Sequence, residues 1–149
     1  MNDLRQLEEE QERRNEKSRY AMRARLLASI MIPTWFPDYD PTIYHLDHKF
    51  SVSCGYENHI PLEIISAQHN LQLLSPEDNR RKGKKCSISI EELVEAYQPH
   101  PFVSEVVAML KRMPLWKLEK ASIHVSRRLR QLRKARQVSF GVSRPLPSP

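Results

Sequence analysis

Residues 46–85 read LDHKFSVSCGYENHIPLEIISAQHNLQLLSPEDNRRKGKK, and the fold that we expect follows from the order of elements in this segment. Apolar and polar residues alternate over residues 42–50, which predicts a β-strand. Residues 51–69 form a long connection with one helical turn at PLEIIS, and residues 70–74 predict a second short strand. A helix then begins after Ser75, so the order of elements is strand, strand, helix.

The helix that follows Ser75 carries clear local signals. Ser75 suits the N-cap and Pro76 the first helical position, while Asp78 places a carboxylate near the free N–H groups of the first turn. The cations at the other end suit the negative end of the helix dipole. Asn79 has no such local reason, because Asn forms helices poorly away from their caps.

Asp47 and His48 are adjacent on the first predicted strand, so their side chains point to opposite faces. If Asp47 faces the helix, it can meet Asn79. Both side chains offer oxygen ligands, which suit a hard divalent cation such as Mg²⁺. A neutral His48 beside them could take a proton from water. His45 shares the face of Asp47 and could support this site.

Taken together, residues 46–85 resemble the HNH (ββα-metal) endonucleases, above all the phage-encoded type that includes homing endonucleases. The family's first element is an Asp-His or His-His pair, which corresponds to Asp47-His48 here. The family's middle Asn corresponds to Asn70, and its last element, on the helix, corresponds to Asn79. The resemblance implies an α+β fold with a small ββα-metal core flanked by several α-helices.

The resemblance also implies an activity, which is metal-dependent hydrolysis of DNA phosphodiester bonds by nicking or double-strand cutting. Asp47 and Asn79 would be the ligands of Mg²⁺ or of another divalent cation such as Mn²⁺. His48 would be the catalytic base, and Asn70 would be a catalytic residue that fixes the loop and orients His48. A phage origin would place the protein in the cytoplasm of a bacterial host.

The distribution of charge points to a polyanion as partner. The net charge is +6, yet residues 111–149 hold 11 Lys and Arg against one acid, whereas residues 31–110 hold 6 against 11. The basic residues lie on a predicted helix, about 115–136, which favours DNA binding. The helix at 3–31 is the second candidate for reading DNA. The predicted DNA contacts are Arg80, Arg81, Lys82, Lys84, Lys85, Arg127, Arg128, Arg130, Arg133 and Lys134.

We expect four regions along the chain. Residues 1–31 form a charged N-terminal helix, which the prolines at 33, 37 and 41 prevent from continuing. Residues 32–88 form the nuclease core. Residues 89–138 form a basic helical region that begins with a capping box, Ser89 and Glu92, and residues 139–149 form a disordered tail.

Two cysteines, Cys54 and Cys86, exclude a four-cysteine zinc site and a disulfide framework, so we expect no structural zinc. No stretch approaches the ~18 apolar residues of a membrane span, and the N-terminus lacks the apolar core of a signal peptide. We therefore expect a reduced, cytoplasmic setting without a membrane partner.

Two alternatives to a homing-type nuclease remain open. A resolvase of branched DNA could use the same motif and would act as a homodimer. A DNA-binding or packaging accessory protein could retain the fold without catalysis, although the intact Asp47, His48 and Asn79 argue against it.

Overall fold

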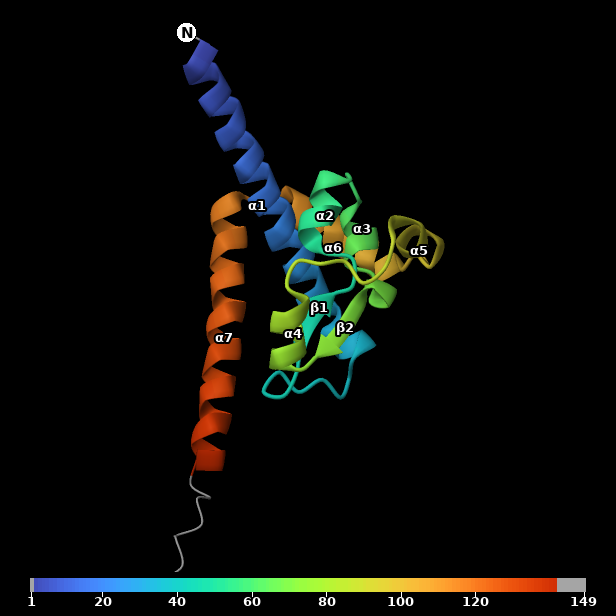
Figure 1. Cartoon of the computed structure of the whole chain (residues 1–149), viewed down its shortest axis with the longest axis vertical. Coiled ribbons are helices and arrows are strands. Elements are labelled where there is room, and N and C mark those ends of the chain that lie inside the picture. Colours follow the sequence, from blue (N-terminus) through green and yellow to red (C-terminus); the bar gives the residue numbers. More distant parts are fainter. Residues whose placement is uncertain (1, 142–149) are drawn as a thin grey trace, which may run out of the picture.

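The structure, a computed structural model, describes residues 2–141 and has an α+β fold with many helices and one small antiparallel sheet (Figure 1). The elements are α1 (Asn2–Trp35), β1 (His45–His48), α2 (Val52–Glu57), α3 (Leu62–Ile65), the 3₁₀ turn η1 (Gln68–Asn70), β2 (Leu71–Leu74), α4 (Pro76–Lys82), α5 (Ile90–Glu95), α6 (Pro101–Arg112) and α7 (Leu115–Gly141). The fold class predicted from the sequence is confirmed at this level.

The sheet is a two-stranded antiparallel hairpin on which α4 packs. His45 lies opposite Leu74 and His48 opposite Leu71, and α4 contacts both strands. The first strand is shorter than the predicted 42–50, because the side chain of Asp40 accepts hydrogen bonds from the backbone and hydroxyl of Thr42 and forms a turn there. Asn70 belongs to the 3₁₀ turn before β2 rather than to the strand.

Helix α1 continues through Pro33 to Trp35, so the prediction that it ends near residue 31 is wrong. A proline in the last turn removes a single backbone hydrogen bond, and the buried Met31 holds this end of the helix in the core. The Phe36 N–H still bonds to the Ile32 carbonyl at 2.7 Å. The chain leaves the helix after this turn, at Pro37.

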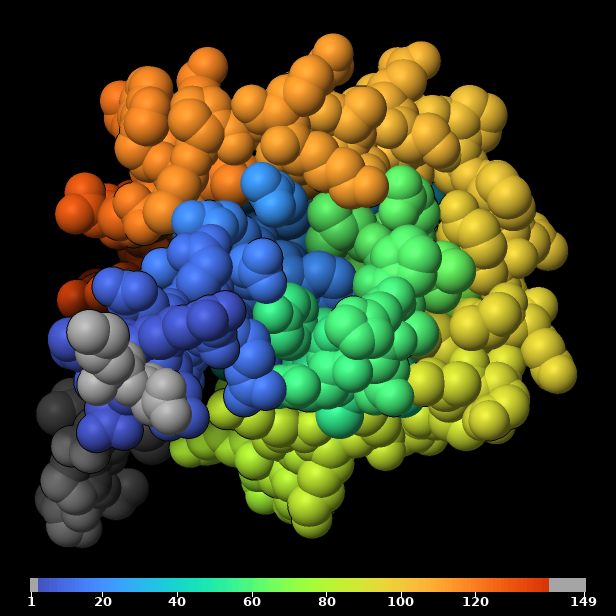
Figure 2. Space-filling model, turned by 90° about the horizontal axis from the view of Figure 1, so that it is seen from above, coloured from blue at the N-terminus to red at the C-terminus, as the bar shows by residue number. Residues whose placement is uncertain are grey.

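The core forms around the C-terminal half of α1, which supplies Ala24, Leu27 and Met31. Helices α2, α3, α6 and α7 pack against α1, and Figure 2 shows the surface of α1 (blue) flanked by α6 (orange) and by α2 and α3 (green). The N-terminal half of α1 projects from this body and is exposed (Figure 1). The core of the protein is therefore formed mainly by helices that pack against α1.

Helix α7 is longer than predicted and reaches Gly141. Residues 139–141 are therefore helical, which corrects the start of the predicted disordered tail; the rest of that tail lies outside the described residues. Leu118 near the start of α7 is fully buried in the core, and Arg136 near its end donates to Asp40 and Thr42. The helix is thus attached to the body at two separate places.

Gly55 in α2 lies where α2 meets α1 and α3. A Cβ atom there would come within 2.7 Å of both Ile65 Cδ1 and the Tyr20 hydroxyl. We expect Gly55→Ala to lower the free energy of unfolding by about 1–3 kcal/mol, because the Ile65 and Tyr20 side chains must shift to admit the methyl group. Urea denaturation would measure this. Ser53→Ala on the same helix should change it by less than about 0.5 kcal/mol, and equal effects would contradict close packing at Gly55.

Candidate active site

A cleft of about 700 Å³ lies between the hairpin unit and the basic helix α7, with part of α1 as its floor. It is lined by three of the four residues predicted for the catalytic site, namely Asp47, His48 and Asn79. Arg128 and Arg133 of α7 also line it. The structure therefore brings the predicted catalytic residues and the predicted DNA-binding helix to one cleft.

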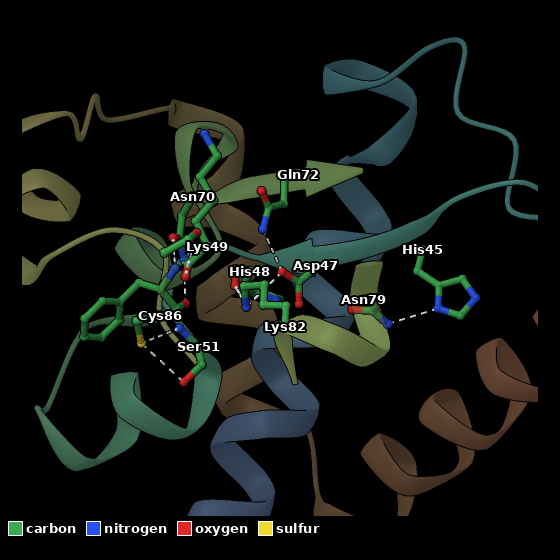
Figure 3. Close-up of polar contacts among 12 residues, drawn as sticks. His45, Asp47, His48, Lys49, Ser51, Asn70, Gln72, Asn79, Lys82 and Cys86 are labelled. Carbon is green, nitrogen blue, oxygen red and sulfur yellow. Dashed lines mark hydrogen bonds and ion pairs between the residues drawn. The ribbon is translucent and has the colours of Figure 1, made fainter. Parts of the chain in front are cut away.

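Asp47 lies in the middle of β1 and is paired on two sides. Its Oδ2 atom accepts a hydrogen bond from Gln72 Nε2 at 2.9 Å, because Gln72 is its partner across the hairpin. The same oxygen is 3.0 Å from Lys82 Nζ, and the side chains of Asp47 and Lys82 are only 15% and 12% exposed. Figure 3 shows the Lys82 ammonium between Asp47 and the backbone of His48. Both contacts are made by Oδ2, so Oδ1 remains available as a ligand atom for a cation.

Asn79 lies in α4 and points toward β1. Its amide nitrogen pairs with His45 Nδ1 at 3.0 Å, so its amide oxygen is left on the side that faces Asp47 (Figure 3). Burial, with smaller contributions from Arg133 and Arg80, lowers the pKa of His45 and keeps its ring neutral, so that Nδ1 can accept this bond. The contact with Asn79 is consistent with the predicted supporting role of His45.

The oxygen atoms of Asp47 and Asn79 form a donor set that a small hard cation would accept. Within residues 2–141, no three His, Cys, Asp or Glu side chains are grouped so that they could hold a metal ion. A cation here would have one carboxylate, one amide oxygen and otherwise water or substrate oxygen. Mg²⁺ is commonly held in this way, by one or two carboxylates together with water and phosphate. The residues therefore fit Mg²⁺ or Mn²⁺ better than zinc, which prefers His and Cys.

His48 ends β1 and points into the protein. Its side chain is 9% exposed, and its Nε2 atom is buried without a hydrogen-bond partner among the described residues. Burial lowers the pKa of His48 to about 4, although the charge of Asp47 acts in the opposite direction. The ring is therefore neutral at pH 7, and it is a weaker base than a free imidazole.

Asn70 holds the loop that follows His48, and its side chain makes hydrogen bonds with backbone groups. Its side chain is fully buried, accepts from the Phe50 N–H at 2.7 Å, and donates to the carbonyls of Phe50 and Ile65 at 3.1 and 2.6 Å. Its own carbonyl accepts from the Lys49 N–H at 2.7 Å. Asn70 therefore positions His48 through the backbone of the two residues after it.

The predicted DNA contacts on α4 and directly after it are not equivalent. Lys82 is mostly buried and its ammonium pairs with Asp47. Arg81 pairs with Glu77 and Asp78 on the surface of the helix. Arg80, Lys84 and Lys85 are exposed, and Lys84 also lines the cleft.

The predicted DNA contacts on α7 fall into two groups. Arg128 and Arg133 line the cleft, but Arg133 also donates to the Pro41 carbonyl at 3.0 Å. Arg127 faces a separate groove beside Trp116, and Arg130 and Lys134 are exposed. Gln72 and Arg136 were not among the predicted site residues, because hairpin register and loop contacts are not visible in a local sequence pattern.

In comparisons with family models, with curated proteins and with solved structures, nothing matches this chain. None of the helices over residues 2–141 is both long and apolar enough to cross a membrane.

Proposed function

We propose that this protein is a metal-dependent DNA endonuclease of the HNH (ββα-metal) type. The observation that supports this proposal is the convergence of Asp47, His48 and Asn79, from a hairpin and the helix that packs on it, in a cleft lined by a basic helix. The motif residues lie up to 32 positions apart in the sequence, and nothing in local secondary structure requires them to meet. A catalytic site gives a reason for their meeting.

Each residue would have a separate task in phosphodiester hydrolysis. Asp47 and Asn79 would hold a divalent cation through their oxygen atoms, and this cation would supply stabilisation of negative charge on the scissile phosphate. His48 would accept the proton of the attacking water through its neutral ring, although the low pKa that burial gives this ring makes it a weaker base than a free imidazole. Asn70 would keep the loop after His48 in place.

The basic helix α7 would bind the DNA backbone beside the catalytic residues. Exposed Arg and Lys side chains bind phosphates with little regard to sequence, so their main task would be affinity and orientation. Arg128 is the cation of α7 that is both exposed and on the cleft wall. DNA bound along α7 would therefore pass close to Asp47 and His48.

The direct test is to incubate supercoiled plasmid with the protein in Mg²⁺, in Mn²⁺ and in EDTA. We expect open-circular or linear product with either metal and none with EDTA, because the cation stabilises the charge that develops on phosphate. An assay on a library of DNA sequences in Mn²⁺ would detect a demanding recognition site. Absence of cleavage across that library would contradict the proposal.

Neutral substitutions on α7 should weaken DNA binding in a salt-dependent way. We expect Arg127→Gln, Arg128→Gln and Arg130→Gln together to reduce the slope of log K against log salt by about 2 to 3, because each lost phosphate contact removes ~0.9. Fluorescence anisotropy with a labelled duplex at several salt concentrations would measure the slope.

The control for this prediction removes three cations from the projecting half of α1, by Arg5→Gln, Arg13→Gln and Arg14→Gln. These arginines are exposed and far from the cleft lining. The slope should stay the same. A larger reduction of this slope in the α1 variant than in the α7 variant would indicate that α1, and not α7, forms the DNA-binding surface.

A non-catalytic DNA-binding protein is the second candidate, and one observation favours it. The Lys82 ammonium already neutralises the Asp47 carboxylate, as happens in ion pairs with a structural role. Under this reading, duplex binding would depend on α7, and no metal would produce cleavage. The plasmid and library assays separate the two candidates.

A further inference from the structure

Lys82 differs from every other cation in the run of basic residues after Asn79. Its side chain is 12% exposed, and its ammonium is 3.0 Å from Asp47 Oδ2 and 2.9 Å from the His48 carbonyl oxygen. Lys84 and Lys85, which follow it, are exposed. A lysine is rarely buried unless it is paired, so this position is defined by its two oxygen partners.

The fold fixes Lys82 in this position. Lys82 comes three residues after Asn79 and therefore lies on the same face of α4, toward β1. Gly83 follows with φ 56°, a left-handed conformation that ends the helix and turns the chain away. The ammonium thus contacts the carboxylate that would bind a cation, on the same side of the helix as the amide of Asn79 (Figure 3).

Two positive charges cannot both be well neutralised by the single carboxylate of Asp47. A divalent cation at the Asp47 and Asn79 oxygens would lie near the Lys82 ammonium, and this repulsion would weaken its binding. A phosphate group in the cleft would reduce this repulsion, because it brings a negative charge with which the Lys82 ammonium can pair in place of Asp47. Lys82 lines the same cleft and can reach such a group.

We propose that Lys82 is an internal counter-ion that keeps the cation position at Asp47 and Asn79 weak until a nucleic-acid phosphate enters the cleft. This inference rests on the proposed function. Binding of the cation and binding of DNA then support each other, and each raises the affinity for the other by the same factor. The free protein holds its metal loosely, and the complex with DNA holds it tightly.

The experiment measures Mn²⁺ affinity by electron paramagnetic resonance, which reports the free hydrated ion. Wild type, Lys82→Met and Lys82→Gln are titrated without DNA, and circular dichroism melting establishes that each is folded. Lys84→Met is the matched control, because it removes the same charge from the same cleft without a contact to Asp47. The titrations are then repeated with a duplex oligonucleotide in a His48→Ala background, so that the DNA stays intact.

Without DNA, both Lys82 variants should bind Mn²⁺ at least about tenfold more tightly than wild type, an effect within the usual range of coupling between sites. Lys84→Met should change the affinity by no more than about twofold, since its charge is exposed to solvent. DNA should raise Mn²⁺ affinity strongly in the protein with Lys82 and much less in the two variants.

Two results would overturn the inference, and they differ in meaning. Equal or weaker Mn²⁺ binding by both folded Lys82 variants, with measurable binding by wild type, would remove the counter-ion role and leave the proposed nuclease intact. No Mn²⁺ binding by any of the proteins, with or without DNA, would remove the cation site itself and with it the proposed function.

Discussion

His48→Ala should abolish cleavage of supercoiled plasmid while DNA binding is kept. Loss of a general base lowers the rate by a factor of about 10² to 10⁴, which would leave no detectable product in a standard assay. The His48 side chain is 9% exposed, so a bound duplex gains little from direct contact with it. The dissociation constant of the His48→Ala variant for DNA should therefore differ from that of the wild type by less than about threefold, which is under about 1 kcal/mol.

The control for this prediction is His124→Ala. His124 is a second histidine on the wall of the same cleft, but it lies on α7 and is exposed. Its removal should leave the cleavage rate within about twofold, since His124 is exposed and is not one of the three residues Asp47, His48 and Asn79. Because His48 is buried, a melting curve must accompany the assay, and His48→Gln provides a second variant that keeps more of the volume. Cleavage by folded His48→Ala at the wild-type rate would exclude His48 as the base.

Asn70→Ala should destabilise the protein by about 3 to 5 kcal/mol, because each buried group left without its partner costs ~1–3 kcal/mol. The substitution removes the partners of the Phe50 N–H and of the carbonyls of Phe50 and Ile65, all in the interior. Total stabilities of domains are about 5–15 kcal/mol, so this loss is a large share. Urea denaturation followed by circular dichroism would measure it.

Asn58→Ala is a matched control for Asn70→Ala. Asn58 also donates from its side chain to a backbone carbonyl, that of Cys54 at 2.8 Å, but it is exposed and water can replace the bond. The expected change is about 0.5 kcal/mol or less. Similar losses for the two variants would mean that the buried network of Asn70 does not stabilise the loop after His48.

The sequence predicted those parts of the fold that have a local cause. Ser75 accepts from the Asp78 N–H and Pro76 begins α4, as their types and order indicated. Ser89 and Glu92 form the reciprocal capping box. These bonds link residues three apart, so a short window of sequence contains all that determines them.

The sequence did not predict features that depend on tertiary contacts. The contacts of Asn70 with Phe50 and Ile65 exist only because the loop closes on itself, so the residue type alone did not indicate these partners. Lys82 was grouped with its basic neighbours, although its place three residues after Asn79 does put it on the inner face of α4. That helical spacing was the available signal for its pairing with Asp47.

Helix α7 contacts both the core and the segment that precedes β1. Leu118 fixes its first turns in the core, and Arg136 ties its far end to Asp40 and Thr42, just before β1 begins at His45. The helix therefore acts as a strut between the core and the segment that leads into the strand of Asp47 and His48. A displacement of the end of α7 would therefore act on the segment just before β1 through the contacts of Arg136.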